Sequence, residues 1–321
     1  MLEVRNLSLA VRIDGRQVEA VSDLSLRLEP GRVLGLVGES GCGKSLTAQA
    51  MLRLGEHQGV EKTAGDILLD GESLFALDEP ALRRVRGKRI AMVFQEPMTA
   101  LNPVFSIGSQ MMDVIRMHLD LDKTARRARA VQLLQDVGLE DAEGLLKQYP
   151  DALSGGMRQR VLIAIAMAAD PDYIIADEPT TALDVSVQKR IIALLLNLQR
   201  QRGLGLLLVT HDFGLVAEMC DDVAVMYAGQ IVERGTVAEI FDHPAHPYTR
   251  ALMACRPEVS APGAALPVIP GQVPPPGSWP AGCHFADRCE RVTDDCRRAA
   301  VAEDAWMDDA HRARCLRVLQ C

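Results

Sequence analysis

Apolar and polar positions alternate over the first 35 residues of the chain. The apolar positions fall into two runs, Leu7, Leu9 and Val11, and then Leu24, Leu26 and Leu28. A period of two places alternate side chains on one buried face, as in an antiparallel sheet. The Asp14-Gly15 pair between the two runs is typical of a tight turn. We therefore expect this segment to form antiparallel strands.

Short, uninterrupted apolar runs replace this alternation further along the chain. The four runs are Val33–Val37, Ala91–Phe94, Tyr173–Ala176 and Leu206–Val209. Runs of this length, separated by segments of helical period, are typical of strands in a buried parallel sheet. Residues 104–150 contain no such run and show a helical period with basic patches. The pattern predicts an α/β fold with a parallel-sheet core, an antiparallel β subdomain and a helical insertion.

The composition changes after His243. The sequence is rich in Pro and Gly up to Pro280, and a cysteine-rich tail follows. A shift of this kind is typical of a domain boundary. We expect a main domain over residues 1–242 and a smaller C-terminal extension over residues 243–321.

Length, charge and hydropathy narrow the class of protein. A chain of 321 residues is long enough for about two domains. Its net charge of −8 argues against a nucleic-acid partner, which usually requires a basic surface. The longest apolar stretch, Val161–Ala169, has about half the length that a membrane-spanning helix needs.

The first residues and the cysteines bear on the compartment. Met1-Leu2-Glu3-Val4-Arg5 lacks the basic and apolar regions of a signal peptide, so we expect the chain to stay in the cytosol. The eight cysteines are then expected to be thiols or metal ligands rather than disulfides.

Candidate chemistry follows directly after the first apolar run. The segment Gly38-Glu39-Ser40-Gly41-Cys42-Gly43-Lys44-Ser45 fits the phosphate-loop pattern G-x-x-x-x-G-K-[ST], between a predicted strand and a predicted helix. The glycines allow backbone N–H groups to converge on phosphate oxygens at a helix N-terminus. Lys44 would supply a charge for the β- and γ-phosphates, and Ser45 a hydroxyl for Mg²⁺. A glycine-rich turn that binds nothing is the alternative.

Two carboxylates follow the third apolar run. Asp177 ends the predicted strand, and an acid in this place beside a phosphate loop can hold Mg²⁺. Glu178, one residue later, can polarise the attacking water as a general base. The alternative is a solvated strand end that happens to carry two acids.

A second anion-binding helix start is predicted at Ser154-Gly155-Gly156, which precedes an apolar helical segment. Two phosphate-binding helix starts and one set of acids suggest a nucleotide shared between two subunits. A plain helix cap formed by Ser154 is the alternative.

In this order, the motifs resemble those of the ATP-binding subunits of ABC transporters. Gln95 resembles the Q-loop glutamine, which touches Mg²⁺ and communicates with the membrane subunits. Ser154-Gly155-Gly156 resembles the signature motif, which faces the γ-phosphate bound to the partner subunit. Ala182-Leu183-Asp184 resembles the D-loop, and His211 resembles the switch histidine that contacts the γ-phosphate.

This resemblance covers residues 1 to about 240 and implies a RecA-like P-loop ATPase core with a helical subdomain at about 104–155. It implies ATP and Mg²⁺ as cofactors, with Glu178 and His211 as catalytic residues. The residues implied in nucleotide binding are Gly38, Glu39, Ser40, Gly41, Cys42, Gly43, Lys44, Ser45, Gln95, Ser154, Gly155, Gly156, Asp177 and Asp184. Among these, Ser45, Gln95 and Asp177 are the implied Mg²⁺ ligands.

Three further segments resemble the dipeptide, oligopeptide and nickel importer branch of that family. They are Gln95–Pro103, His246-Pro247-Tyr248-Thr249 and Gly282–Cys289. The resemblance implies an ATP-hydrolysing subunit that powers uptake of dipeptides, oligopeptides or a related solute such as nickel complexes.

The same resemblance implies partners and a location. The partners are a second ATPase subunit, in a homodimer or a heterodimer, two integral membrane permeases and, indirectly, an extracytoplasmic solute-binding protein. No nucleic acid is expected. The chain would lie at the cytoplasmic face of the bacterial inner membrane as a peripheral subunit. A soluble ABC ATPase uncoupled from transport is the alternative, but long coiled-coil insertions and a second cassette, which are usual in that class, are absent from the sequence.

The chain departs from the family pattern in its first hairpin. No aromatic residue precedes Phe75, although these ATPases usually stack an aromatic ring on adenine near this hairpin. Val11, Arg12 and Ile13 occupy the approximate position. We expect an apolar contact or a stacked guanidinium in place of the ring.

Four cysteines, Cys283, Cys289, Cys296 and Cys315, lie in a tail poor in core-forming residues. A small segment of this kind needs a cross-link or a metal to hold it. Four thiolates suit tetrahedral Zn²⁺ or an iron–sulfur cluster, and reduced thiols in a loose tail are the third possibility. Some members of the resembled branch carry a [4Fe–4S] cluster here, so the resemblance favours that group.

Overall fold

The computed structural model describes residues 1–181, 183–256, 267–298, 300–305 and 310–318. The chain forms two compact units. The first unit comprises Met1–Leu28, Val33–Phe75 and Val209–Cys321, and the second comprises Glu29–Arg32 and Ala76–Leu208. The predicted domain boundary at 242/243 was based on a change in composition, whereas these two units are defined by compactness. That boundary stays a prediction.

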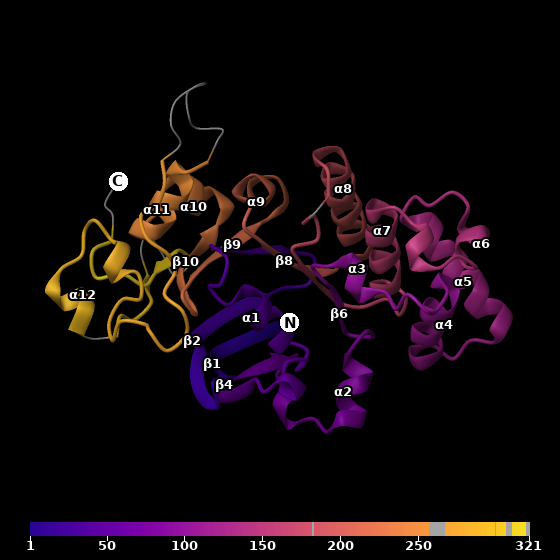
Figure 1. Cartoon of the computed structure of the whole chain (residues 1–321), viewed down its shortest axis with the longest axis horizontal. Coiled ribbons are helices and arrows are strands. Elements are labelled where there is room, and N and C mark those ends of the chain that lie inside the picture. The colour runs from indigo at the N-terminus through magenta and orange to yellow at the C-terminus, as the bar shows by residue number, and fades with distance from the viewer. Residues whose placement is uncertain (182, 257–266, 299, 306–309, 319–321) are drawn as a thin grey trace. The chain divides into compact units, whose positions relative to one another are not determined.

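The first unit contains a four-stranded antiparallel sheet (Figure 1). Its strands, in spatial order, are β2 (Arg16–Leu28), β1 (Leu2–Ile13), β4 (Glu61–Leu69) and β5 (Glu72–Ser73). β1 and β2 form the predicted hairpin, in which Ile13 pairs with Arg16 across the Asp14-Gly15 turn. A bulge lies between Val4 and Leu7. Because of it, the even-numbered Leu2 and Val4 and the odd-numbered Leu7 and Leu9 are all buried.

The second sheet of this unit contains β3 (Val33–Val37), the strand that precedes the phosphate-loop motif. Its strands follow one another in the order β11 (Asp304–Ala305), β12 (Arg312–Ala313), β10 (Gln230–Thr236), β9 (Asp222–Tyr227) and β3. β3 and β9 are parallel, and the other neighbouring pairs are antiparallel. The C-terminal tail thus adds two short strands to the edge of this sheet.

The described part of the first unit also contains the helices α1 (Lys44–Ala50), α9 (Phe213–Met219), α10 (Val237–Asp242), α11 (Pro247–Ala254) and α12 (Asp294–Arg298). A buried apolar core joins residues of both predicted domains. Within it Tyr227 of β9 packs edge-on against Tyr248 of α11, with ring centroids 4.6 Å apart, and against Phe285 of the tail at 5.2 Å. The extension is therefore packed on the core of this unit. In Figure 1 its yellow segment lies beside the orange β10 and α11.

The second unit contains β6 (Ile90–Val93), β7 (Tyr173–Asp177) and most of β8 (Gly205–Thr210). β6 and β7 pair in parallel, with Ile90 opposite Tyr173. Its helices are α2 (Glu79–Val85), α3 (Pro97–Ala100), α4 (Ile107–His118), α5 (Lys123–Asp136), α6 (Ala142–Leu145), α7 (Gly155–Ala166) and α8 (Val185–Arg202).

Short 3-10 turns occur in both units. They cover Glu56–Gln58, Leu74–Ala76, Pro150–Ala152 and Ala286–Arg288.

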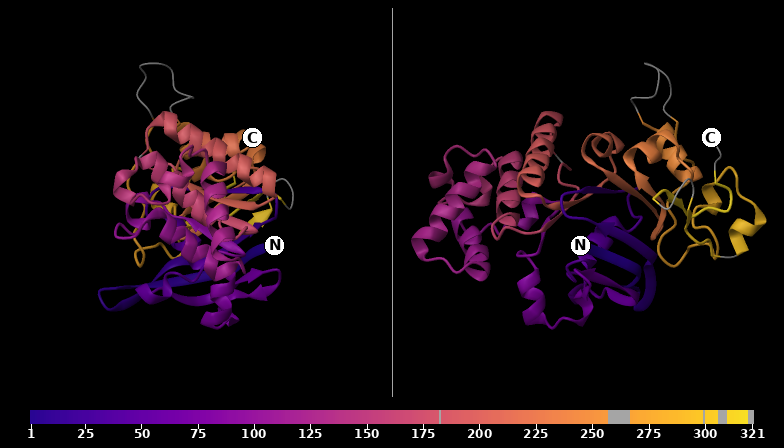
Figure 2. Two further views of the ribbon diagram at one scale, coloured as in Figure 1. Left: turned by 90° about the vertical axis from the view of Figure 1, so that its right-hand side faces the viewer. Right: turned by 180° about the vertical axis from the view of Figure 1, so that it is seen from behind.

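Residues 104–150 form the predicted helical segment. Helices α4 and α5 contact each other, and both contact α7. Figure 2 shows α4, α5 and α6 grouped together, apart from the strands of this unit. The four predicted core strands also appear, each within one residue of its expected bounds. The α/β fold class is confirmed.

Candidate nucleotide-binding site

The predicted phosphate loop connects the end of β3 to the start of α1 in the first unit. Gly41 and Gly43 have φ angles of +79° and +108°, which side-chain-bearing residues rarely adopt. A Cβ atom at Gly38 would lie 2.1 Å from the carbonyl oxygen of Met226. These three glycines are therefore required by the backbone path of the loop.

Lys44 is buried, and its ammonium group faces the inside of this loop. Nζ donates hydrogen bonds to the carbonyl oxygens of Gly38, at 2.8 Å, and Glu39, at 3.0 Å. The side chain of Cys42 is buried beside it, and burial raises the pKa of that thiol. A buried ammonium held by two carbonyl groups is positioned for exchange onto the oxygens of a phosphate.

His211 directly follows β8, and its side chain is exposed. The next residue, Asp212, caps α9 by accepting hydrogen bonds from the backbone N–H groups of Gly214 and Leu215, at 2.7 and 3.2 Å. The cap fixes the backbone that directly follows His211.

In the second unit, the structure brings Gln95 and Glu178 together. Nε2 of Gln95 donates to Oε2 of Glu178 at 2.9 Å, and the Thr181 hydroxyl donates to the same oxygen at 2.8 Å. Glu178 has a φ angle of +44°, a strained value for a residue with a side chain. Two side-chain donors and an unusual backbone conformation therefore fix the orientation of this carboxylate.

Thr181 was not identified from the sequence as part of this site. Its position three residues after Glu178 offered the only local signal. Asp177 is the last residue of β7, and it is buried.

The glycines of the predicted signature motif begin α7. Ser154 caps this helix by accepting a hydrogen bond from the backbone N–H of Met157 at 3.3 Å, and both Ser154 and Gly155 are exposed. A Cβ atom at Gly156 would lie 2.8 Å from Cγ1 of Val187. The helix start thus presents its N–H groups at the surface, while Gly156 permits close packing against α8.

Asp184 caps α8. Its carboxylate accepts hydrogen bonds from the Ser186 hydroxyl at 2.6 Å and from the Val187 N–H at 2.9 Å. These hydrogen bonds, that of Ser186 foremost, lower the pKa of Asp184. Ala182, two residues before it in the predicted D-loop, lies outside the described residues.

The four tail cysteines, Cys283, Cys289, Cys296 and Cys315, line one small cavity. Burial raises the pKa of Cys283 to about 11 and also raises the pKa of Cys289 and of Cys315. The cavity volume is about 10 Å³, which is space for about one water-sized atom. In the part of the chain that the structure describes, no group of three or more His, Cys, Asp or Glu side chains has an arrangement that could hold a metal ion.

Within the described ranges, no helix is both long enough and apolar enough to cross a bilayer.

Two family models match the chain. Residues 21–181 match the model described as ABC transporter, and residues 232–296 match the model described as oligopeptide/dipeptide transporter, C-terminal region. The second match begins before the predicted boundary at 243 and reaches the third tail cysteine.

Similar proteins extend over nearly the whole chain. A protein of Brucella abortus (strain 2308) named as a peptide import ATP-binding protein is 48% identical over 92% of this chain and 89% of its own length. A second protein of that strain with the same kind of name is 45% identical over 99% of this chain and 97% of its own. A solved dimeric ATP-binding cassette, in a post-hydrolysis state bound to ADP and Pi, has a TM-score of 0.65 at 26% identity. It covers 74% of this chain and 99% of its own.

Proposed function

The chain belongs to the ABC transporter family, and on that premise we propose that it is the ATP-hydrolysing subunit of an importer of dipeptides or oligopeptides. The observation that carries this proposal is the pair of hydrogen bonds on Glu178, because they hold a carboxylate directly after β7, where the family's hydrolytic base is expected. The name of the Brucella relatives and the C-terminal family match support the peptide class of solute.

We propose the following roles for the site residues. Lys44 and the N–H groups of the Gly38–Ser45 loop bind the ATP phosphates. Glu178 accepts a proton from the attacking water, in the orientation that Gln95 and Thr181 impose. His211 contacts the γ-phosphate.

The candidate Mg²⁺ ligands are a hydroxyl, an amide and a carboxylate, on Ser45, Gln95 and Asp177. Oxygen donors of this kind are those that Mg²⁺ prefers. Bound there, the ion would neutralise charge on the phosphates. The amide nitrogen of Gln95 donates its hydrogen bond to Glu178, so the amide oxygen is the atom of Gln95 that would bind Mg²⁺.

We propose that the second ATPase subunit, identical or homologous, completes each site. The exposed N-terminus of α7, with Ser154, Gly155 and Gly156, would face the nucleotide held by the other subunit, with Asp184 at the same contact. Two permeases, and indirectly a solute-binding protein, complete the transporter at the cytoplasmic face of the inner membrane. Residues 1–242 would serve as the nucleotide-binding domain and residues 243–321 as the extension.

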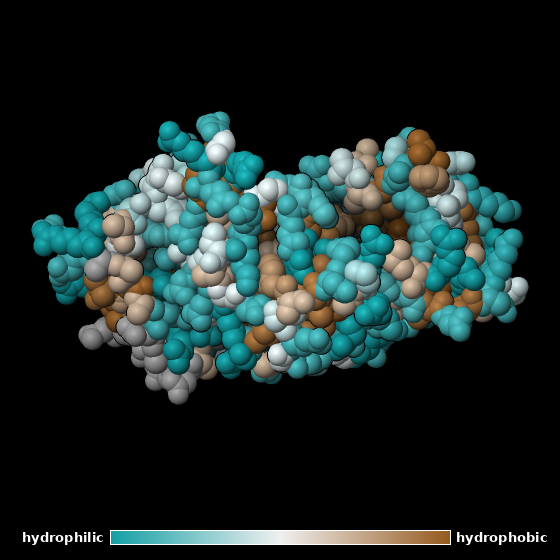
Figure 3. Space-filling view, turned by 90° about the horizontal axis from the view of Figure 1, so that it is seen from below, coloured by the Kyte–Doolittle hydropathy of each residue, from teal (hydrophilic) through white to brown (hydrophobic). Residues whose placement is uncertain are grey.

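The proposed permease contact lies on α3 and the loop that follows it. Met98, Val104 and Phe105 are all exposed apolar side chains in this segment. On the face shown in Figure 3, apolar residues occur in separate groups among hydrophilic ones. A short permease helix with an apolar face would cover it.

This contact gives the test of the proposed function. In proteoliposomes that contain the chain and its permeases, we expect ATP-driven uptake of a labelled dipeptide. A benzophenone side chain placed at Met98, which is 63% exposed, should then form an adduct with a permease on irradiation. The same group at Val268, which is 79% exposed in the extension, is the matched control and should form none. No adduct at Met98 in transport-active vesicles would contradict the proposed contact, and absence of dipeptide uptake would contradict the solute class.

We also propose a metal group for the four tail cysteines, with a [4Fe–4S] cluster as the form favoured by the resemblance. Their shared cavity supports a common ligand. The present spacing does not fit a four-iron cluster, because the cavity is too small and the thiols lack a ligand arrangement.

The cysteine proposal predicts iron and acid-labile sulfide in equal amounts in anaerobically purified, full-length protein. Cys289→Ser should lose both and keep ATP binding, whereas Cys255→Ser, outside this cavity, should keep both. Zinc in place of iron would retain the four-thiolate site and exclude the cluster. Metal-free protein with four alkylatable tail thiols would exclude the site.

A further inference from the structure

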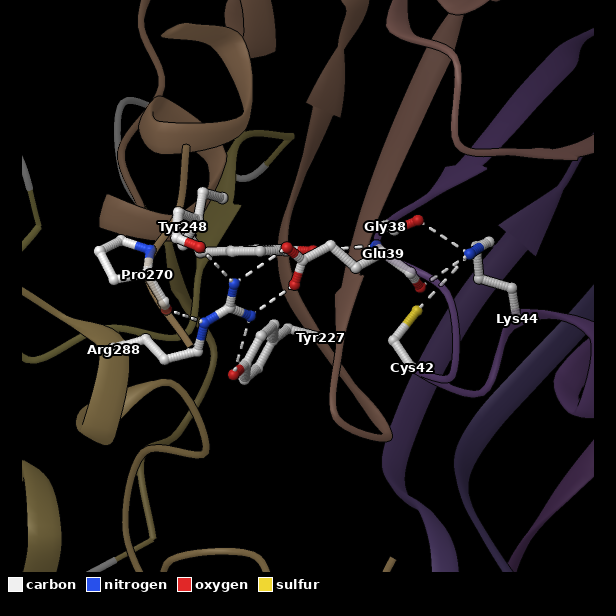
Figure 4. A network of polar contacts seen from close by, with 9 residues as sticks. Gly38, Glu39, Cys42, Lys44, Tyr227, Tyr248, Pro270 and Arg288 are labelled. Atoms are coloured by element: carbon white, nitrogen blue, oxygen red, sulfur yellow. Dashed lines mark hydrogen bonds and ion pairs between the residues drawn. The ribbon is translucent and has the colours of Figure 1, made fainter. Parts of the chain in front are cut away.

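Glu39, the second residue of the phosphate loop, is held from three directions (Figure 4). Its backbone N–H donates to the Tyr248 hydroxyl at 3.0 Å. Its carbonyl oxygen accepts from Nζ of Lys44 at 3.0 Å. Its carboxylate binds the guanidinium group of Arg288 through two hydrogen bonds, of 2.5 and 3.0 Å. Two of these three partners, Tyr248 and Arg288, belong to the C-terminal extension.

The guanidinium group of Arg288 is itself fixed. Nε donates to the carbonyl oxygen of Pro270 at 2.8 Å, Nη2 also donates to that of Ile269 at 3.2 Å, and Nη1 also reaches the Tyr227 hydroxyl at 3.4 Å. With the two bonds to Glu39, each of the five N–H groups of the side chain has an acceptor. The side chain is 6% exposed. Arg288 therefore holds Glu39 from a rigid position rather than as a mobile surface charge.

Arg288 lies against an aromatic cluster, with its guanidinium group 5.7 Å from the centre of the Tyr227 ring. Tyr248 and Phe285, from the extension, have ring centroids 5.2 Å apart, and both pack against Tyr227 of β9. β9 is the parallel neighbour of β3, the strand that leads into the phosphate loop. The extension is thus connected to the loop both through the sheet and directly through Glu39.

The contacts of Lys44 show when the extension would matter most. At present Nζ holds the carbonyl groups of Gly38 and Glu39. When this ammonium turns to a phosphate, those carbonyl contacts weaken, and Arg288 and Tyr248 remain to hold the loop. Arg288 also neutralises the carboxylate of Glu39, which is 28% exposed in a loop that must accept a highly anionic ligand.

We propose that Arg288 is a positioning residue for ATP binding: by pairing with Glu39 it keeps the phosphate loop in its binding conformation and neutralises its one carboxylate. The extension thereby sets the ATP affinity of the core. This inference rests on the proposed function, because it requires that the loop binds ATP.

The test is a titration of the full-length chain with Mg²⁺ and ATP, together with steady-state hydrolysis. Arg288→Gln should raise the Kd and the KM for ATP about tenfold, equivalent to about 1.4 kcal/mol, and change kcat by less than about twofold. Arg288→Lys, which keeps a positive charge, should recover part of the loss. Arg250→Gln is the matched control, because Arg250 is an exposed arginine that lines the same surface cavity as Arg288 and should leave Kd unchanged.

A second variant separates positioning from general support of the fold. Glu39→Gln should also weaken ATP binding, and the double variant Arg288→Gln with Glu39→Gln should bind no more weakly than the weaker single variant, because both remove one shared interaction. If Arg288→Gln fails to fold, Glu39→Gln carries the test alone.

Several outcomes would overturn the inference. These are an unchanged Kd in Arg288→Gln, losses that multiply in the double variant, or a lower melting temperature with kcat and KM affected alike. A wild-type chain that does not bind ATP would instead overturn the proposed function.

Discussion

Glu178→Gln is expected to reduce ATP turnover by about 10²–10⁴-fold, the usual contribution of a general base, and to leave ATP binding intact. Glutamine has the size of glutamate, and its amide oxygen can still accept the hydrogen bonds of Gln95 and Thr181. The substitution therefore removes the proton acceptor and preserves the local structure. In the proposed two-subunit arrangement, product formation would separate the subunits, so the variant should also accumulate as an ATP-bound dimer.

The measurement is steady-state phosphate release, with size-exclusion chromatography in ATP for the dimer. Glu140→Gln is the control, since Glu140 is an exposed glutamate of the same unit that has no proposed role. Turnover in Glu178→Gln within a factor of two of the wild type would remove Glu178 from the role of base.

The sequence predicted the core strands well because each is a continuous apolar run with its own local signal. Tyr173–Asp177, for example, is buried at every position. The alternation in the first strand does not follow one period, because of the bulge between Val4 and Leu7. Even-numbered residues face the core before the bulge, and odd-numbered residues face it afterwards. The prediction did not include β9 and β10, which pair with each other as a hairpin. It also missed the two short tail strands, which join the sheet through the pairing of β12 with β10, far away in the chain.

In the candidate site, too, the residues with a local sequence signal were the predictable ones. The phosphate loop, Glu178 and Ser154 stand in local motifs, so their elements could be anticipated from adjacent residues. Arg288 could not be found in this way, because 249 positions separate it from Glu39 and its own surroundings contain no nucleotide motif. Packing of Tyr248 and Phe285, from the extension, on Tyr227 of β9 brings the two charges together.

Lys44→Ala is expected to weaken ATP binding by about 10²-fold or more. The ammonium group is buried in the loop and hydrogen-bonded to two carbonyl groups, so alanine removes the loop's only cation and leaves both acceptors without this donor. A hydrogen bond to a charged group contributes about 1.5–3 kcal/mol, and the upper value corresponds to roughly 10²-fold in affinity. ATP titration of the full-length variant measures the loss, with the exposed Lys147→Ala as its control.

Ser154→Arg should behave differently from Lys44→Ala, and the contrast tests whether two subunits share each nucleotide. Ser154 lies on the second unit, at the exposed start of α7, where its hydroxyl oxygen accepts a hydrogen bond from the N–H of Met157. An arginine there should leave this chain's own ATP affinity within about twofold, because no phosphate-loop contact is removed, yet block hydrolysis at the partner's site by filling the surface that must approach it. ATP titration and steady-state phosphate release on the same preparation separate the two effects. Equal loss of ATP binding in Ser154→Arg and Lys44→Ala would contradict the shared-site geometry, because it would place Ser154 in the same half-site as the phosphate loop.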